Sequence, residues 1–287
     1  MVRLGIDIGG SKIALAARDG SHMLFEHRVG LDTHPAPDEV LAALAAYLER
    51  QCAVHGRPAT IAIASAPNLD RDGRVERWPN RPAWEGAPVV ATLAPFARER
   101  IVWCDDGTAA TLADAWTLGA RNLVHFSLGT GVGGGICVDG SVLRDRELGH
   151  LLVHPHGAPC SCGRHGCLQA YASGRAFERL AERHPADVAA ARWLDGAADA
   201  LAACSANLVE LFHSTCITLS GGLVHRFPAL PDAVARALGA TFLKRPLAMP
   251  EIRLSPHGGD APLQGALALA AAPDAEQRAA CRHWRAA

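Results

Sequence analysis

The clearest indication of the fold is the segment VRLGIDIGGSKIALAARDGSHMLFEHRV, which occupies residues 2–29. Its apolar runs predict three short strands, at residues 2–8, 12–18 and 22–29. A glycine turn separates the first two strands, and Asp19-Gly20, a typical hairpin turn, separates the last two. The chain is therefore expected to begin with a strand, a glycine turn and a β-meander.

The second half of the chain repeats this order of elements. Leu123–Ser127 is a predicted strand that enters a second glycine turn, Gly129–Gly135, and Ile136–Val142 is a predicted return strand. Apolar periodicity elsewhere predicts helices near residues 40–52, 108–117, 172–184, 186–193, 195–213, 229–239 and 262–271, and strands at 60–65, 101–104 and 216–219. This alternation predicts an α/β protein with two related lobes.

The composition is that of an ordinary globular chain. Of its 287 residues, 49% are hydrophobic and 20% are charged, which is enough apolar material for a large core. The 28 basic and 29 acidic residues give a net charge of −1, so no nucleic-acid or membrane partner is expected. The sequence contains no basic-then-apolar leader and no apolar run of ~18 residues, so we expect a cytoplasmic protein.

Three glycine turns are candidates for binding phosphate. They are Asp7-Ile8-Gly9-Gly10-Ser11-Lys12, Gly129–Gly135 and Ser220-Gly221-Gly222, and each follows a predicted strand. Glycine lets backbone N–H groups approach an anion closely, although any one of these turns is equally compatible with a simple hairpin. Asp7 could hold Mg²⁺ through water, and the hydroxyls of Ser11 and Thr130 could donate to phosphate oxygens.

The middle turn also contains the spacing G-x-G-x-x-G of dinucleotide-binding proteins. That interpretation requires a helix directly after the turn, whereas Ile136–Gly140 is predicted to form a strand and a turn. The motif G-x-x-x-x-G-K-[ST] does not occur in the chain. We therefore expect neither a dinucleotide-binding domain nor a P-loop enzyme.

Asp105 and Asp106 stand where a predicted strand ends and a predicted helix begins. A helix N-terminus favours negative charge, so a carboxylate at this position has good reason to stay ionised. Such an acid can simply cap the helix, or it can act as a general base that takes the proton of an attacking hydroxyl during phosphoryl transfer. The sequence leaves both interpretations open.

The segment ELGHLLVHPHGAPCSCGRHGCLQ, residues 147–169, predicts a metal site. His150, Cys160, Cys162 and Cys167 form the ligand set of a closed tetrahedral zinc site, with glycines where the chain would wrap around a small ion. The alternative is a group of buried thiols with an unrelated histidine. Because four protein ligands leave no position for water, the predicted zinc is structural.

Together these motifs resemble the ROK family of sugar kinases along nearly the whole chain. The matching stretches are DIGGSK at 7–12, RWPNRPAW at 77–84, DDGTAATLAD at 105–114, SLGTGVGGG at 127–135, ELGH at 147–150, CSCGRHGCLQ at 160–169 and SGG at 220–222. The resemblance implies a two-lobed actin/hexokinase-like (ribonuclease H-like) α/β fold with a zinc-bound loop in the larger lobe. It implies a small lobe at 1–105, completed by a C-terminal helix at 270–287, and a large lobe at 106–269 with the nucleotide and zinc sites.

The resemblance also implies roles for individual residues. The implied reaction is transfer of the ATP γ-phosphoryl group to a sugar 6-hydroxyl, with Mg²⁺ at the phosphates and Asp106 as catalytic base. The residues implied to bind nucleotide are Asp7, Gly9, Gly10, Ser11, Lys12, Thr130, Gly131, Gly221 and Gly222. Those implied to bind sugar are Asn68, Asn80, Asp105, Glu147, His150 and Gln169. The residues implied to bind Zn²⁺ are His150, Cys160, Cys162 and Cys167. His150 would bind the metal through one ring nitrogen and offer its other ring edge to a sugar hydroxyl.

Three departures from the family pattern all fall on the implied sugar side. Asp105 replaces an asparagine, Gln169 replaces a glutamate, and the loop Ser65-Ala66-Pro67-Asn68 replaces G-x-P-G. A carboxylate gains little against a neutral hydroxyl but forms a charge-assisted hydrogen bond with a ring ammonium, so we expect Asp105 to recognise an amino group on a glucose-like ring. Within the family, the pattern resembles the kanosamine (3-amino-3-deoxyglucose) kinases of antibiotic pathways. A glucokinase, or an N-acetylmannosamine or cyclitol kinase, is the alternative.

Two other classes of protein are alternatives to a sugar kinase. Transcriptional repressors of the ROK type share the sugar lobe but carry an N-terminal helix-turn-helix, which is not expected here because the phosphate motif already begins near residue 7. A zinc-stabilised binding module without catalysis would leave the three glycine turns and Asp106 without a purpose. Family members are often dimers, so the expected partners are ATP, a small-molecule sugar and a second copy of the chain.

Overall fold

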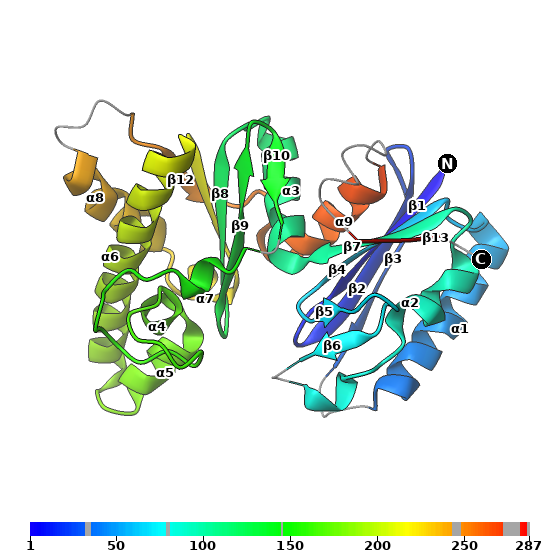
Figure 1. The fold of residues 1–287 in the computed structure, drawn as a ribbon, viewed down its shortest axis with the longest axis horizontal. Coiled ribbons are helices and arrows are strands. Elements are labelled where there is room, and N and C mark those ends of the chain that lie inside the picture. Colours follow the sequence, from blue (N-terminus) through cyan, green and yellow to red (C-terminus); the bar gives the residue numbers. More distant parts are fainter. Residues whose placement is uncertain (32–35, 79–80, 145, 243–247, 272–281, 286–287) are drawn as a thin grey trace. The chain divides into compact units, whose positions relative to one another are not determined.

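The protein is described by a computed structural model that covers residues 1–31, 36–78, 81–144, 146–242, 248–271 and 282–285 (Figure 1). The chain divides into two compact units, Met1–Leu112 with Pro262–Ala287, and Ala113–Ala261. One boundary falls inside helix α3 (Asp106–Leu118) and the other at the start of helix α9 (Ala261–Ala271). The expected lobes, 1–105 and 106–269, have their boundaries after residues 105 and 269, whereas the two units divide after Leu112 and Ala261.

The first unit is built on a six-stranded sheet with the order β13-β7-β4-β1-β2-β3. The predicted meander is present as β1 (Val2–Ile8), β2 (Lys12–Asp19) and β3 (His22–Gly30), which pair antiparallel. Two further strands, β4 (Thr60–Ser65) and β7 (Arg100–Asp105), extend the sheet parallel to β1. The edge is formed by β13 (Arg282–Arg285), which runs antiparallel to β7.

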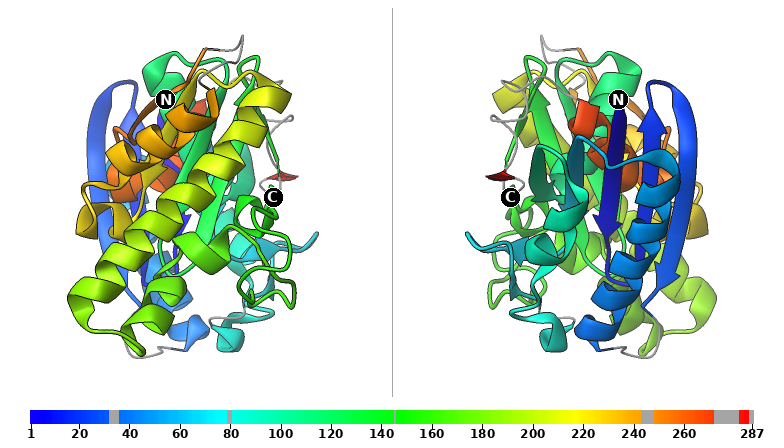
Figure 2. Two further views of the ribbon diagram at one scale, coloured as in Figure 1. Left: turned by 90° about the vertical axis from the view of Figure 1, so that its left-hand side faces the viewer. Right: turned by 90° about the vertical axis from the view of Figure 1, so that its right-hand side faces the viewer.

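Helices pack on both faces of this sheet (Figures 1 and 2). Helix α1 (Pro37–His55) buries Leu41, Leu44 and Leu48, which lie on one side of the helix and share a core with the apolar side chains of β1 and β4. Leu263 and Leu267 of α9 pack against alternate residues of β2, and therefore on the other face. Gly5 of β1 permits this contact, because a Cβ there would lie only 2.8 Å from the backbone N of Leu267.

A set of short elements connects β4 to β7. They are β5 (Asn68–Leu69), β6 (Val75–Arg77), η1 (Pro82–Trp84), α2 (Val89–Leu93) and η2 (Ala94–Phe96). The strands β5 and β6 pair antiparallel as a small separate sheet. Trp78 and Trp84 pack edge to face in the core of the unit, with ring centroids 5.5 Å apart. Two buried indoles therefore fix this segment, in which the apolar pattern of the sequence predicted no helix or strand.

The second unit is built on a five-stranded sheet with the order β10-β9-β8-β11-β12. Its strands are β8 (Leu123–Leu128), β9 (Val132–Val138), β10 (Ser141–Leu143), β11 (Cys216–Ser220) and β12 (Glu251–Leu254). The first three form an antiparallel meander, and β8, β11 and β12 run parallel. The second unit therefore repeats the strand, glycine turn and meander of the first, as the sequence indicated.

Helix α6 (Ala186–Phe212) crosses one face of this sheet (Figure 2). The sequence predicted two helices here, at 186–193 and 195–213, and that prediction was wrong. Gly196 costs about 1 kcal/mol in a helix interior, but buried Trp193 and Ala197 on either side keep the helix continuous. The other elements of the unit are η3 (Leu148–His150), α4 (Gln169–Ala172), α5 (Gly174–Ala181), α7 (Gly222–Arg226), α8 (Leu230–Phe242) and η4 (Gly258–Asp260).

Two further expectations need correction. The helix predicted at 172–184 is interrupted at Ser173, an extended residue whose Oγ accepts from the N–H of Ala176 and so caps α5. The helix predicted at 270–287 is also wrong for the described residues: α9 ends at Ala271, and residues 282–285 form strand β13. Within the described residues, no helix is both long and apolar enough to cross a membrane.

Candidate functional site

Three candidate segments of the first unit begin at one edge of its sheet. The strands β1, β4 and β7 are parallel neighbours, and their last residues Ile8, Ser65 and Asp105 are adjacent in the register. The first glycine turn, the Ser65–Asn68 loop and the start of α3 therefore leave the sheet together. Ligands of open α/β sheets bind outside the carboxyl ends of parallel strands, so this edge is the candidate site of the unit.

A backbone hydrogen bond closes the first glycine turn, and the residues at its tip are exposed. The N–H of Gly9 donates to the carbonyl of Lys12 at 2.9 Å, and Gly10 and Ser11 are exposed. Asp7, which precedes the turn, is only 4% exposed. Space remains around Gly10, where an added Cβ would meet no atom within 4 Å. This arrangement leaves room for an anion at the turn.

Arg81 holds this turn from the side. Its Nε donates to the carbonyl of Gly10 at 2.7 Å, and its Nη2 donates to the carbonyl of Leu31 at 2.8 Å. Sequence reasoning did not single out Arg81, although it lies in the 77–84 stretch that resembles the family. Asn80, the sugar-contact candidate next to it, lies outside the described residues.

Asp105 caps helix α3. Its Oδ1 accepts from the backbone N–H of Thr108 at 2.7 Å, and its Oδ2 accepts from the Thr108 hydroxyl at 2.5 Å. The sequence left capping and chemistry open for the pair, and the capping contacts belong to Asp105. Recognition of a ring ammonium by Asp105 stays a prediction. Asp106 is the first residue of α3 and is half-buried.

The Ser65–Asn68 loop is fixed by a buried hydroxyl. Ser65 Oγ donates to the carbonyl of Pro67 at 2.7 Å and accepts from the indole N–H of Trp103, also at 2.7 Å. Ser65 is fully buried, and Asn68 is exposed at the start of β5. A residue that differs from the family glycine therefore carries specific hydrogen bonds in this chain.

In the second unit, two glycine turns lie against one another. Gly221 has a φ of +97°, and a Cβ there would lie 2.3 Å from the carbonyl oxygen of Leu128, so only glycine fits. The chain leaving Leu128 enters the middle turn, where Gly129 N–H donates to the carbonyl of Gly131 at 3.0 Å and Gly129 O accepts from the N–H of Gly174 at 2.8 Å. The candidate phosphate residues Thr130, Gly131, Gly221 and Gly222 are all at least partly exposed. The middle turn continues into strand β9 rather than a helix, as expected, which excludes the dinucleotide-binding arrangement.

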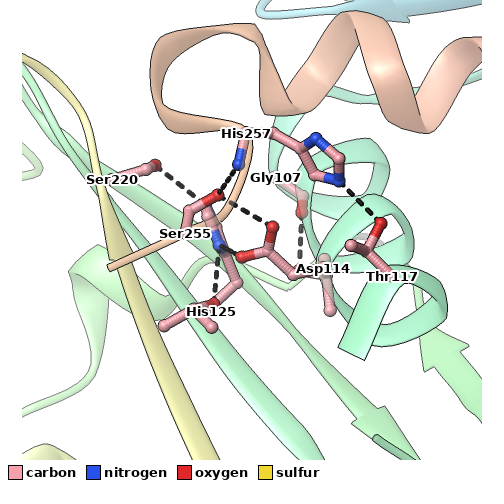
Figure 3. Close-up of polar contacts among 9 residues, drawn as sticks. Gly107, Asp114, Thr117, His125, Ser220, Ser255 and His257 are labelled. Carbon is pink, nitrogen blue, oxygen red and sulfur yellow. Dashed lines mark hydrogen bonds and ion pairs between the residues drawn. The ribbon is translucent and has the colours of Figure 1, made fainter. Parts of the chain in front are cut away.

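A buried polar network lies behind these turns (Figure 3). His125 of β8 contacts Asp114 Oδ2 of α3 through Nδ1 at 2.8 Å and the hydroxyl of Ser220 through Nε2 at 3.0 Å. The hydroxyl of Ser255 donates to Asp114 Oδ1 at 2.8 Å, and Thr218 Oγ1 lies 3.0 Å from His125 Nδ1. Asp114 and His125 are both 0% exposed. The network joins α3, β8, β11 and the segment after β12 into one hydrogen-bonded group.

The pKa of Asp114 reflects this environment. Burial alone would raise the pKa of Asp114, but the hydrogen bond and charge of His125, with the hydroxyls of Thr218 and Ser255, outweigh it and hold the pKa below its ordinary value. An ionised carboxylate only accepts hydrogen bonds, so Nδ1 of His125 carries the proton that it donates to Asp114. Through this one imidazole, the network connects Asp114 of α3 to Ser220, one residue before the Gly221-Gly222 turn.

The predicted metal ligands come together in the second unit. The ligand atoms of His150, Cys160, Cys162 and Cys167 all lie within 4.8 Å of one another. Cys160 Sγ is 3.6 Å from His150 Nδ1, and Cys162 Sγ is 3.7 Å from Cys167 Sγ. A tetrahedral zinc ion sets S···N and S···S separations of about 3.6 and 3.8 Å. The donor set and its spacing therefore suit a zinc ion.

Two of these thiols differ sharply in acidity. Hydrogen bonds from the backbone and side chain of Arg164 lower the pKa of Cys162 to about 6. Burial, together with the neighbouring thiols, raises the pKa of Cys167 to about 12. Arg164 also donates to the carbonyl of His150 at 3.0 Å. One arginine thus supports both the exposed thiol and the histidine of the cluster, and sequence reasoning did not identify it.

Glu147 and Gln169 bracket the cluster. Glu147 is exposed directly before η3, and Gly149 in η3 lies so close to β9 that a Cβ would be 2.2 Å from the carbonyl oxygen of Val132. Gln169 accepts from the N–H of Val132 at 3.1 Å and donates to the hydroxyl of Ser161 at 3.1 Å. Gln169 thus connects the middle glycine turn to the cysteine loop. Its expected contact with sugar stays a prediction.

Comparison with known proteins accounts for this combination of turns, acids and cysteines. The ROK family model matches residues 3–272. A kanosamine kinase of Amycolatopsis mediterranei is 33% identical over 289 residues, covering 93% of this chain and 95% of that protein. The crystal structure of a ROK hexokinase from Thermus thermophilus has a TM-score of 0.74 at 30% identity, covering 93% of this chain and 97% of that chain.

A ROK family glucokinase from Streptomyces griseus, solved in complex with glucose and AMPPNP, has a TM-score of 0.72 at 25% identity. The match covers 94% of this chain and 99% of that chain. The expected actin/hexokinase-like α/β fold is therefore confirmed. Because the family match spans both units and every described motif of the candidate site, the chain belongs to the ROK family.

Proposed function

We propose that the protein is an ATP-dependent sugar kinase that transfers the γ-phosphoryl group to the 6-hydroxyl of a glucose-like aminosugar, with kanosamine favoured. The observation that carries this proposal is the strand edge of the first unit. There the glycine turn after Asp7 follows β1, and the helix that starts at Asp106 follows β7. Both strands are parallel neighbours of β4, which lies between them. The names of the relatives, a kanosamine kinase and a glucokinase crystallised with glucose and AMPPNP, support the same reaction.

In this proposal Asp106 is the catalytic base. Its neighbour Asp105 already accepts both hydrogen bonds from Thr108, so the cap of α3 is satisfied without Asp106. Asp106 is half-buried at the first position of the helix, where the helix dipole favours its ionised form. An ionised carboxylate there can accept the proton of the attacking 6-hydroxyl as the phosphorus–oxygen bond forms.

The glycine turns supply the phosphate contacts in this proposal. Phosphoryl transfer depends on positioning and charge neutralisation, for which backbone N–H groups and hydroxyls suffice when a divalent cation is bound. Gly9, Gly10, Ser11 and Lys12 would serve in the first unit, and Thr130, Gly131, Gly221 and Gly222 in the second. Mg²⁺ would neutralise charge on the transferred group, and buried Asp7 is suited to hold it through water.

We also propose that the cysteine cluster holds a structural Zn²⁺. The near-tetrahedral spacing of its sulfur and nitrogen atoms supports this, as does the use of four protein ligands, which leaves no position for water. The bound ion would fix the loop between Glu147 and Gln169. Glu147, His150 and Gln169 would then present polar groups to the sugar from one rigid segment.

The aminosugar part of the proposal rests on charge. Asp105 adds a carboxylate where the family has an amide, and Gln169 removes one where the family has a glutamate. A ring ammonium gains a charge-assisted hydrogen bond from this exchange, whereas a neutral hydroxyl gains little. The second candidate, a glucokinase, is favoured by the glucose bound to the Streptomyces griseus relative. We expect a homodimer in the cytoplasm, and light scattering of the purified protein tests the oligomeric state.

A coupled kinase assay with MgATP tests the function. The panel contains glucose, 2- and 3-aminohexoses, N-acetylhexosamines and cyclitols, and we expect the highest kcat/KM with 3-amino-3-deoxyglucose. If the enzyme phosphorylates glucose much faster than every aminosugar, the charge argument is wrong and the protein is a glucokinase. Phosphorylation of no sugar in the panel would overturn the kinase assignment in favour of a binding module.

A further inference from the structure

The C-terminal strand contacts a segment that it is far from in sequence. In the register of β13 with β7, Arg282 pairs with Trp103 and Trp284 pairs with Ile101. Arg282 and Trp284 are two residues apart, so their side chains lie on the same face of the strand, and Arg285 lies on the other. The strand is at the edge of the first unit's sheet, next to β7 (Figure 1).

Both of these side chains donate hydrogen bonds to the backbone of the loop after β4. The guanidinium of Arg282 donates to the carbonyl of Leu69. The indole N–H of Trp284 donates to the carbonyl of Arg71 at 2.8 Å. One strand therefore bonds to two carbonyls of this segment, at the end of β5 and in the turn that follows it.

A third carbonyl of this segment, that of Pro67, also accepts a side-chain hydrogen bond. The carbonyl of Pro67 accepts from Ser65 Oγ, which itself accepts from the indole N–H of Trp103, each at 2.7 Å. The guanidinium of Arg282 lies over the ring of Trp103, 5.5 Å from its centre, within the range of a cation–π contact. Three successive alternate carbonyls, at 67, 69 and 71, are thus bonded to side chains that belong to or contact β7 and β13.

The opposite side of this segment is bonded to β6. Asn68 and Leu69 pair with Arg77 and Val75 in the two-stranded sheet, and Leu69 is fully buried. The segment from Pro67 to Arg71 is therefore held on both sides, by backbone bonds on one and by donated side-chain bonds on the other. The exposed side chain of Asn68 projects from a backbone whose position is fixed.

We infer that Arg282, Trp284 and Trp103 are positioning residues for the sugar, acting through the Ser65–Arg71 segment that carries Asn68. The inference rests on the proposed function, because Asn68 is a sugar contact only in that proposal. Ser65 stands where the family has a glycine, which has no side chain to accept from Trp103 or donate to Pro67. The position of this segment is therefore a property of this chain's own residues.

The test compares truncation after residue 281 with two point variants. Trp284→Phe removes the bond to the carbonyl of Arg71 but keeps an aromatic ring, and Arg282→Met removes the charge and the bond to the carbonyl of Leu69. Arg282→Lys keeps a cationic donor and serves as the rescue variant. Arg285→Ala, on the other face of the same strand, is the matched control.

We expect each lost hydrogen bond to raise the KM for the sugar about fivefold, the equivalent of about 1 kcal/mol, with kcat and the KM for ATP within about twofold of wild type. Arg282→Lys and Arg285→Ala should stay close to wild type. Hydrogen exchange of peptides covering residues 66–77 should become about tenfold faster in the truncated protein. Exchange needs no turnover, so it reports on the segment whichever sugar is the substrate.

Three outcomes would overturn the inference. Unchanged exchange in the truncated protein would show that β13 does not position the segment. Faster exchange with an unchanged sugar KM would show that the segment does not set sugar affinity. Equal losses in sugar KM, ATP KM and kcat would indicate a general loss of structure. Failure of wild-type protein to phosphorylate any sugar would instead count against the proposed function, and the exchange result would stand separately.

Discussion

Replacing His125 with phenylalanine should reveal how strongly the buried network of the second unit depends on one imidazole. Phenylalanine keeps an aromatic ring but removes both ring nitrogens, which contact Asp114, Thr218 and Ser220 at 2.8, 3.0 and 3.0 Å. All three partners are almost fully buried, so water does not readily replace the lost bonds. The substitution therefore leaves one carboxylate and two hydroxyls short of a partner.

The expected cost follows from these partners. A buried neutral group without its hydrogen bond costs about 1–3 kcal/mol, and a buried carboxylate that loses a partner costs about 3–5 kcal/mol. Asp114 keeps the hydroxyls of Ser255 and Thr218, and the freed Ser220 hydroxyl can rotate, so we expect a loss of about 4 kcal/mol in the free energy of unfolding. That is a large part of the 5–15 kcal/mol typical of whole proteins.

The effect should depend on pH. In wild type the pKa of Asp114 is below its unfolded value, so its contribution to stability is present above about pH 4 and is lost as the pH falls through the folded pKa. Without His125, only the Thr218 and Ser255 hydroxyls oppose the effect of burial, which then raises the pKa of Asp114. Protonation of the carboxyl group then relieves part of the cost, so the variant should lose less stability near pH 5 than at pH 7.

Urea unfolding of a double-mutant cycle measures this directly. Asp114→Asn removes the charge that His125→Phe leaves without its partner, so the double variant should be more stable than the sum of the single losses, by about 2 kcal/mol. The slopes of the unfolding curves must agree for the comparison to hold. Additive losses, or a His125→Phe loss that is equal at pH 5 and pH 7, would refute this account of the network.

Three further predictions concern the candidate site. Asp106→Asn should lower kcat by about 10²–10⁴-fold while isothermal titration still detects sugar binding, and near-normal turnover would remove Asp106 from the role of base. The purified protein should contain about one zinc ion per chain, and Cys160→Ser should lose the metal and lower Tm; wild-type protein without metal would contradict the zinc assignment. Asp105→Asn should keep the cap on α3, since asparagine caps helices as well as aspartate does, but should lower the kcat/KM ratio of aminosugar to glucose by about 5- to 30-fold. An unchanged ratio would exclude Asp105 from ammonium recognition.

The sequence predicted the parts of the fold that depend on local pattern. Strands β1, β2 and β3 followed from apolar runs between glycine turns, and the four metal-ligand candidates followed from the spacing of His150 and the cysteines. Both signals lie within short segments. Local pattern also misled: the sequence predicted two helices, at 186–193 and 195–213, but buried side chains along that stretch keep α6 continuous.

The remaining features depend on residues that are distant in the chain. Asp114, His125 and Ser220 meet only because β8 and β11 are neighbours and α3 packs on their face. Nothing near Trp103 indicates that Arg282 will lie over its ring. The cap bond of Thr108 to Asp105 is local and follows capping rules, and helix capping was one of the two interpretations that the sequence left open for this acid pair.

Helix α3 is fixed at two points along its length. Asp105 and Thr108 fix its beginning, and Asp114 fixes its second half through His125 and Ser255. Between Asp106 and Asp114 the helix rises about 12 Å and turns through about 800°, so one inserted residue would shift the second point by about 1.5 Å and 100°. Either the cap or the buried network would then break. We expect homologous chains that retain both groups to keep the number of residues between them unchanged, even where the loops on either side vary in length.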